Sequence, residues 1–134
     1  MIKHERIGDM ATPEETRRVV EAYFNAWTSK KTDEAYALLA PNLHFGGPIS
    51  TFETAEDFKP GLIGFASLAK SARILELLVD GNRASMLYDC ELPPPAGTVR
   101  IAAFFRVEGG KIRWYETQFD TEGYRQLVAK SKRP

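Results

Sequence analysis

The chain has 134 residues, of which 43% are hydrophobic and 27% are charged, an ordinary mixture for one globular domain. Its 18 basic residues are balanced by 18 acidic ones, so it lacks the basic excess of a nucleic-acid-binding protein. No apolar run approaches the roughly 20 residues of a membrane span, and the first ten residues are largely polar and charged. We therefore expect a single domain over residues 1–134, with neither nucleic acid nor membrane as a partner.

Cysteine and histidine are scarce in this sequence. The single cysteine, Cys90, cannot form an internal disulfide, which fits a reducing cytoplasm. The two histidines, His4 and His44, are too few and too scattered to suggest a metal site with this cysteine. We expect a cytoplasmic protein that holds no metal and no other cofactor.

The first strong structural signal is a helix start at Thr12. In the run Thr12-Pro13-Glu14-Glu15, threonine is an N-cap, proline occupies the first helical position and glutamate the third. Apolar residues then recur with helical spacing: Val19, Val20, Tyr23, Phe24 and Trp27. This pattern predicts a helix over residues 13–28, preceded by an N-terminal arm over residues 1–12.

A second helix, a strand and a third helix are expected before residue 70. Thr32 or Asp33 can cap a short helix that carries Tyr36, Leu38 and Leu39 and ends at Pro41. Residues 43–45 read as a short strand, which the Gly46-Gly47-Pro48 run breaks. Thr54 can cap the third helix, which Pro60 and two glycines are expected to make irregular or split.

The second half of the chain reads as strands joined by turns. The strands are expected at residues 72–79, 84–92, 98–107 and 112–119, with Gly109-Gly110 as a two-residue hairpin turn that needs positive φ. A short helix is expected at 121–128, followed by a solvated basic tail at 130–134. Helices first and a strand meander after them indicate an α+β fold, with helices covering one face of a twisted antiparallel sheet.

Several stretches resemble the nuclear-transport-factor-2-like superfamily, and within it SnoaL-like proteins and ketosteroid isomerases. The stretches are VEAYFNAW (20–27), YALLAPNLHF (36–45), Gly47-Pro48, FFRVEGGKI (104–112) and Phe119-Asp120. The resemblance covers residues 13–124 and implies a cone-shaped cup, a strongly curved antiparallel sheet with the N-terminal helices packed on its concave face. It is specific for fold and poor for function, because the superfamily includes isomerases, cyclases, epoxide hydrolases and binding proteins.

Carried over residue by residue, the resemblance mainly shows which catalytic groups are missing. Gly47 stands at the place of the aspartate base of ketosteroid isomerases, and Ala103 at that of their oxyanion-hole aspartate, while Tyr23 matches their oxyanion-hole tyrosine. Thr117 replaces the water-activating aspartate of limonene-epoxide-hydrolase-like proteins, and no acid matching a SnoaL-like cyclase is found. The side chains of Gly47, Ala103 and Thr117 do not take up a proton at neutral pH. The isomerase and epoxide hydrolase mechanisms of the superfamily are therefore not expected here.

The resemblance and the strand alternation together imply an apolar pocket inside the cup. Its expected lining is Tyr23, Trp27, Phe45, Met86, Tyr88, Ala103, Phe105, Tyr115, Thr117 and Phe119. This lining suits a flat hydrophobic ligand held by one or two hydrogen bonds. The alternative for each aromatic residue is that it only packs in the hydrophobic core. The candidate bases are His44 and Asp89, which face outward in the expected register and would face inward after a one-residue shift.

Two functions stay open at this point. One is a small hydrophobic-molecule-binding protein without the family's usual catalytic acids. The other is an isomerase, cyclase or lyase that acts on a hydrophobic carbonyl compound and uses His44 or Asp89 as its base. The resemblance also implies a homodimer formed through the outer sheet face, where Phe104, Trp114, Glu116 and Gln118 are expected.

Overall fold

The computed structural model describes residues 11–131. In chain order its elements are α1 (Pro13–Thr28), α2 (Thr32–Ala37), β1 (Leu39–Gly46), β2 (Thr51–Phe52), α3 (Ala55–Leu68), β3 (Ser71–Asp80), β4 (Arg83–Glu91), β5 (Thr98–Glu108), β6 (Lys111–Gln118) and α4 (Glu122–Ser131). The expected N-terminal arm and basic tail lie largely outside the described residues. Within the described residues, no helix is long and apolar enough to cross a membrane.

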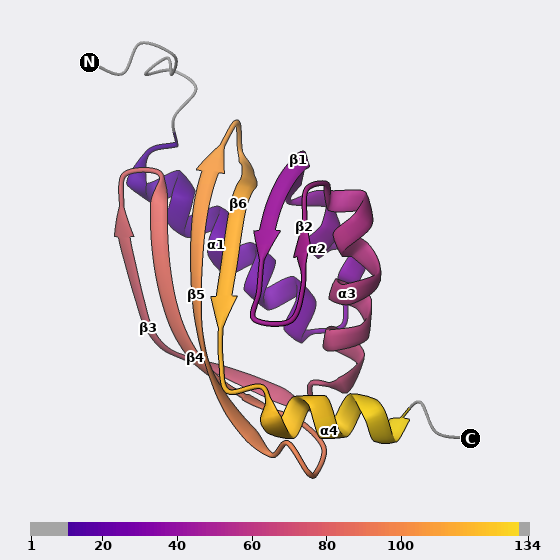
Figure 1. Cartoon of the computed structure of the whole chain (residues 1–134). Helices are drawn as coiled ribbons and strands as arrows, with labels where there is room; N and C mark the ends of the chain where they lie inside the picture. Colours follow the sequence, from indigo (N-terminus) through magenta and orange to yellow (C-terminus); the bar gives the residue numbers. More distant parts are fainter. Residues whose placement is uncertain (1–10, 132–134) are drawn as a thin grey trace.

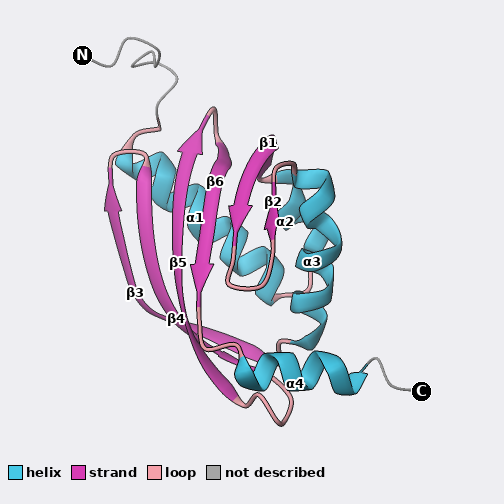
Figure 2. Ribbon diagram, in the orientation of Figure 1, coloured by secondary structure: helices cyan, strands magenta, loops and turns pink. Residues whose placement is uncertain are grey.

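The strands form one curved sheet in the order β2-β1-β6-β5-β4-β3. Strands β3 to β6 pair as an antiparallel meander, as expected. Strand β1 then joins β6 in parallel, so the sheet is mixed and not purely antiparallel. Figure 1 shows the long strands bending around α1, and Figure 2 shows all helices gathered on the concave side and at its open end. The predicted α+β architecture with a curved sheet is thereby confirmed.

Helix α1 forms where local signals predict it. The Thr12 hydroxyl accepts a hydrogen bond from the Glu15 amide (3.1 Å), and Pro13 occupies the first turn. The apolar face of the helix is buried against strands β3 to β6: Val19, Val20, Tyr23, Phe24 and Trp27. Both ends of α1 agree with the predicted bounds, because capping and hydrophobic spacing point to the same element.

The second helix is shorter than expected, and this part of the prediction is wrong. Helix α2 ends at Ala37, and its N-cap is Lys31, which makes no side-chain capping bond. Leu39 and Pro41 already belong to β1, because Leu39 pairs with Ile112 of β6 and the Ile112 amide donates to the Leu38 carbonyl (2.8 Å). Pro41 is tolerated since the register of this pairing shifts between Leu39 and His44.

Two other local expectations have different outcomes. Helix α3 runs unbroken through Pro60, so the expected split is wrong; it begins at the Thr54 cap, whose hydroxyl accepts from the Asp57 amide (3.1 Å). The hairpin turn between β5 and β6 is confirmed, with Gly109 and Gly110 at φ values of 59° and 77°. The short strand β2, which pairs Phe52 with Phe45, was not predicted.

Candidate functional site

A cavity of about 140 Å³ lies between α1, the β1–β2 loop, α3 and strands β4 to β6. Its lining residues are Tyr23, Trp27, Phe45, Gly47, Pro48, Ile49, Ser50, Phe52, Phe58, Gly61, Leu62, Phe65, Tyr88, Ile101, Tyr115, Thr117, Phe119 and Tyr124. Ten of these eighteen are aromatic, so the site offers ring faces and edges to a ligand. Its polar side-chain groups are hydroxyls and the indole N–H of Trp27.

The aromatic wall is built from elements far apart in the sequence. Phe45 of β1 stacks on Phe58 of α3 with ring centroids 4.4 Å apart, and it meets the Tyr115 ring of β6 edge-on at 5.1 Å. Phe52 of β2 extends this group, with its ring centroid 6.1 Å from that of Phe58. Mutual packing of these rings therefore gives the wall a defined shape.

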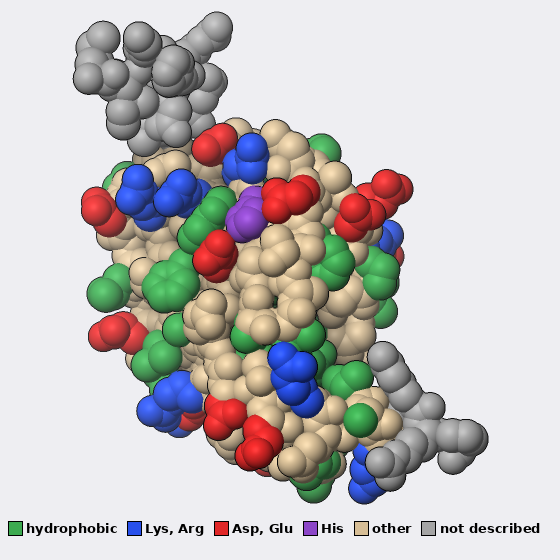
Figure 3. Space-filling view, viewed as in Figure 1, with side chains coloured by type: hydrophobic (Ala, Val, Ile, Leu, Met, Phe, Trp, Pro, Cys, Tyr) green, Lys and Arg blue, Asp and Glu red, His purple; other side chains and the backbone are tan. Residues whose placement is uncertain are grey.

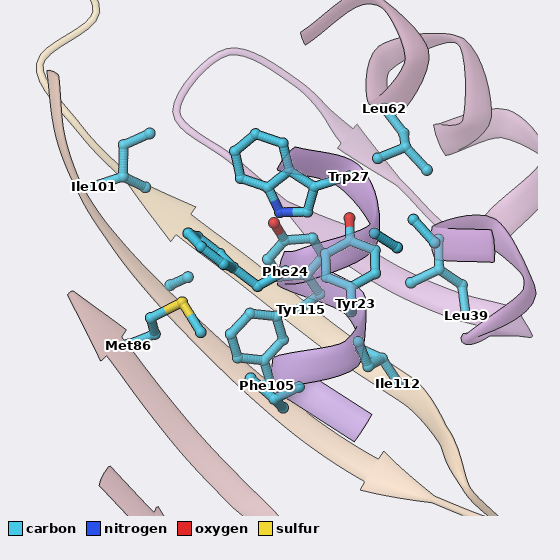
Figure 4. Close-up of a cluster of buried hydrophobic side chains, with 14 of the residues drawn as sticks. Tyr23, Phe24, Trp27, Leu39, Leu62, Met86, Ile101, Phe105, Ile112 and Tyr115 are labelled. Atoms are coloured by element: carbon cyan, nitrogen blue, oxygen red, sulfur yellow. The ribbon is translucent and has the colours of Figure 1, made fainter. Parts of the chain in front are cut away.

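Two tyrosines from distant elements meet at the cavity. Tyr23 projects from α1 and Tyr115 from β6, with their rings edge to face and centroids 5.5 Å apart. Burial raises the pKa of Tyr23 well above its ordinary value and that of Tyr115 to about 12. After burial, the nearness of Tyr115 is the next cause that raises the pKa of Tyr23. Figure 4 shows both hydroxyls pointing toward the side on which Trp27 lies.

A third tyrosine, Tyr88 of β4, reaches the same cavity. Its side chain is only 3% exposed, and its ring packs against Phe24 (5.2 Å between centroids) and Trp27 (5.9 Å). Burial, followed by the nearness of Tyr115, raises its pKa well above the ordinary value. Tyr88 thus lines the cavity together with Tyr23 and Tyr115, and among residues 11–131 no fully buried side-chain nitrogen or oxygen lacks a hydrogen-bond partner.

The rim of the cavity is the loop that joins β1 to β2. The Gly47 amide donates to the Ser50 carbonyl (2.9 Å), which closes this loop into a tight turn. A Cβ atom at Gly47 would lie 3.1 Å from the Phe45 ring and 3.3 Å from Thr117 Oγ1. The absence of a side chain at residue 47 therefore lets the rim pack closely on the aromatic wall.

His44, one of the two candidate bases, lies on the opposite face of β1 from Phe45. Its Nδ1 is 3.1 Å from a Glu53 carboxylate oxygen and its Nε2 is 3.1 Å from Glu116 Oε2, while its ring stacks on Trp114. The hydrogen bond to Glu116 raises the pKa of His44 most; desolvation lowers it by less, and Glu53 raises it further. Figure 3 shows the purple histidine among red acidic side chains on this outer surface.

Asp89, the other candidate base, also faces away from the cavity. Its carboxylate accepts two hydrogen bonds from Arg100, at 2.8 and 3.1 Å, and lies 4.0 Å from Arg73. The Arg100 bond lowers the pKa of Asp89 below its ordinary value. In the described part of the chain, no cluster of three or more His, Cys, Asp or Glu side chains is arranged to hold a metal ion.

The structure brings most of the predicted pocket residues to one place. Seven of the ten line the cavity: Tyr23, Trp27, Phe45, Tyr88, Tyr115, Thr117 and Phe119. The other three, Met86, Ala103 and Phe105, are buried core residues that do not line it. Phe105 is covered by the Tyr115 ring, stacked at 4.8 Å, and by the Tyr23 ring at 6.4 Å, so the tyrosine pair separates it from the cavity.

Sequence reasoning missed the contribution of α3 and of the loop. Phe58, Leu62 and Phe65 line the cavity from one face of α3, and their i, i+4, i+7 spacing was a readable signal. Residues 47–50 and Tyr124 of α4 carried no such signal, because only the folded chain brings them to the rim.

The curved sheet packed against its helices is the fold of NTF2-like α+β proteins. More narrowly, the chain belongs to the SnoaL-like domain family, whose sequence model matches residues 20–115. No curated protein matches the chain significantly.

Solved structures show the same fold at low sequence identity. A protein from Kribbella flavida DSM 17836 superposes with a TM-score of 0.78 at 23% identity, covering 87% of this chain and 96% of that one. An NTF2-like protein of unknown function from Cytophaga hutchinsonii ATCC 33406 gives 0.70 at 22% identity, with 84% and 94% covered. An LEH-like epoxide hydrolase from M. tuberculosis gives 0.70 at 22% identity, with 89% and 96% covered. At these identities the likeness concerns the fold alone.

Proposed function

We propose that this protein binds a small, neutral, largely apolar molecule in the cavity, without the acid–base chemistry known from its fold class. The observation that carries the proposal is the lining, in which the described residues supply rings, aliphatic groups and hydroxyls but no carboxylate, imidazole or amine. A charged ligand would lose its hydration there without gaining a counter-ion, which is strongly unfavourable. A neutral ligand meets no such penalty.

The volume of the cavity limits the size of the ligand. An apolar protein cavity of about 150 Å³ accommodates benzene. The cavity of about 140 Å³ in this structure therefore suits a compound of one ring.

The alternative function is an isomerase, cyclase or lyase that acts on a hydrophobic carbonyl compound. Its support is the fold shared with an epoxide hydrolase and the hydroxyl-bearing cavity. Against it, His44 and Asp89 bond to partners on the outer sheet face, and Gly47 and Thr117 stand where related chemistries need an acid. Binding without turnover is therefore the better-supported proposal.

Thermal melting and enzyme assays test the proposal together. Saturating one-ring hydrocarbons and ketones should raise the melting temperature, because a ligand at 100 times its Kd stabilises the fold by about 2.7 kcal/mol. Turnover of a Δ5-ketosteroid or of limonene epoxide should be absent. A turnover number above about 1 per second, within the usual enzyme range, would contradict the proposal.

We also propose a homodimer that forms through the outer face of the sheet, and a cytoplasmic location. Phe104 and Leu78 are exposed large apolar side chains on strands of this sheet, and Figure 3 shows apolar side chains among charged ones on its outer face. The location rests on Cys90, a free buried thiol whose pKa burial raises to about 11. Recovery of the native protein from an extracytoplasmic cell fraction would contradict it.

A further inference from the structure

We propose that the ligand carries an apolar chain on its ring, and that this chain leaves the cavity between Gly61 of α3 and Ile49 of the β1–β2 loop. The inference rests on the proposed binding function and adds the shape of the ligand. It makes Gly61 and Ile49 the residues that determine which substituents the ligand can carry.

The cavity opens to solvent at one part of its rim. All ten rings that line it are buried or half-buried, and the exposed lining residues are Ile49, Ser50 and Gly61. Ile49 and Ser50 belong to the β1–β2 loop, and Gly61 lies in the middle of α3. The mouth of the cavity therefore lies between this loop and this helix. Figure 1 shows the loop turning back beside α3, with α4 below both.

Gly61 leaves room for a chain at this mouth. Apart from its chain neighbours and the backbone of its own helix, no atom lies within 4 Å of the position that a Cβ would take there. Carbon atoms make favourable contact at about 3.5–4 Å, so a methylene group fits in this space. Glycine also destabilises a helix interior relative to alanine, and Pro60 before it lacks the amide of a helical hydrogen bond. Helix α3 thus has a gap at the mouth where a side chain would favour the helix.

Ile49 supplies the other side of the mouth. It is 44% exposed, although it lines the cavity. Contact with an apolar chain would remove this surface from water, which is favourable in proportion to the area buried. Phe65, one turn after Gly61 on α3, lines the same cavity and is half-buried. A chain that passes Gly61 therefore meets apolar side chains from both the loop and the helix.

Toluene and butylbenzene test the inference, because they share the ring and differ only in the length of an apolar chain. Their dissociation constants are measured by NMR titration of the full-length protein, and the ratio of the toluene value to the butylbenzene value is the chain gain. A fully buried methylene group is worth about 4-fold in affinity, and a half-buried one about 2-fold. Butylbenzene has three more methylene groups than toluene, so the wild type should show a chain gain of roughly 8-fold.

Two glycines on α3 form a matched pair of variants. Gly61→Leu fills the gap at the mouth and should abolish the chain gain, while toluene still binds. Gly64→Leu is the control, because Gly64 is also exposed and also has free space at its Cβ position, but does not line the cavity. It should keep the chain gain of the wild type.

Two isoleucines form a second pair. Ile49→Ser should lower the chain gain about 2- to 4-fold, the worth of one methylene group that loses its contact. Ile63 is equally exposed, at 44%, but lies on α3 outside the cavity lining, so Ile63→Ser should keep the wild-type value. Unchanged toluene binding shows that each variant is folded.

The outcomes distinguish this inference from the function on which it rests. If neither compound binds the wild type, the proposed binding function fails and the inference with it. If toluene binds and butylbenzene binds no more tightly, the binding function stands and the inference is overturned. A wild-type chain gain in Gly61→Leu would show that the chain leaves the cavity elsewhere and would also overturn it. If Gly61→Leu binds neither compound, Gly61→Ala decides: its single methyl group should lower the chain gain while toluene still binds, and an unchanged chain gain would overturn the inference.

Discussion

Each ring nitrogen of His44 faces a carboxylate, Glu53 at Nδ1 and Glu116 at Nε2. A neutral imidazole has one N–H and cannot donate to both, so the fold favours the doubly protonated ring. The folded pKa of His44 is accordingly raised above its ordinary value. Because its pKa is higher in the folded than in the unfolded protein, His44 stabilises the fold at low pH. This stabilisation is complete below the unfolded pKa and is lost as the pH rises through the folded pKa. The close approach of Glu116 also explains Gly46, where a Cβ atom would lie 2.9 Å from Glu116 Oε2.

The sign of this effect gives a prediction for His44→Gln. We expect urea unfolding to show a larger loss of stability at about pH 5.5 than at about pH 8.5, on either side of the histidine range. Glu53→Gln is the control, since it removes the charge of the more exposed partner and should reproduce part of the loss at the lower pH. An NMR titration that placed the His44 pKa at or below its ordinary value would contradict the account.

At the scale of elements, helices α1 and α3 begin in the same way. Thr12 and Thr54 each accept a hydrogen bond from the amide three residues later, at 3.1 Å in both helices. Helix α2 begins at Thr32, and its N-cap residue, Lys31, makes no side-chain capping bond. Thr12→Ala should therefore lower the free energy of unfolding by about 0.5–2 kcal/mol, the usual worth of an N-cap.

Chemical denaturation checks this prediction, with Thr32→Ala as the matched control. Thr32 is the first residue of α2 and not its cap, so its replacement should change stability by less than about 0.5 kcal/mol. Equal effects of the two substitutions would show that the Thr12 cap does not stabilise α1.

At the scale of the whole molecule, we expect two copies of the chain to pair through the exposed face of the sheet. Phe104 is 39% exposed there, while Trp114 on the neighbouring strand is partly covered by His44 and by the Arg106 guanidinium, 4.6 Å from its ring. Light scattering at micromolar concentration should give the mass of a dimer, and Phe104→Glu should shift it toward the monomer. Ile63→Glu, which alters a similarly exposed side chain on α3, should leave the dimer intact. A monomer mass for the wild type would rule the proposal out.

The sequence alone determined those elements whose signals are local. The Thr12 cap and the spacing from Val19 to Trp27 defined α1, and Gly109-Gly110 defined the turn between β5 and β6. Strand alternation separated Phe45 and Tyr115, at the cavity, from His44 and Glu116 on the outer face, because side chains alternate along a strand.

Only the tertiary structure decided those features that depend on contacts between residues distant in the chain. Pairing with β6 makes Leu39 and Pro41 part of strand β1, although the local sequence pattern favours a helix up to Pro41. Helix α3 and residues 47–50 close the cavity and so set its volume, which no single segment encodes. The Tyr23 ring of α1 meets the Tyr115 ring of β6, and Tyr88 reaches the same cavity from β4. Contacts of this kind depend on the packing of whole elements, which periodicity along the chain does not report.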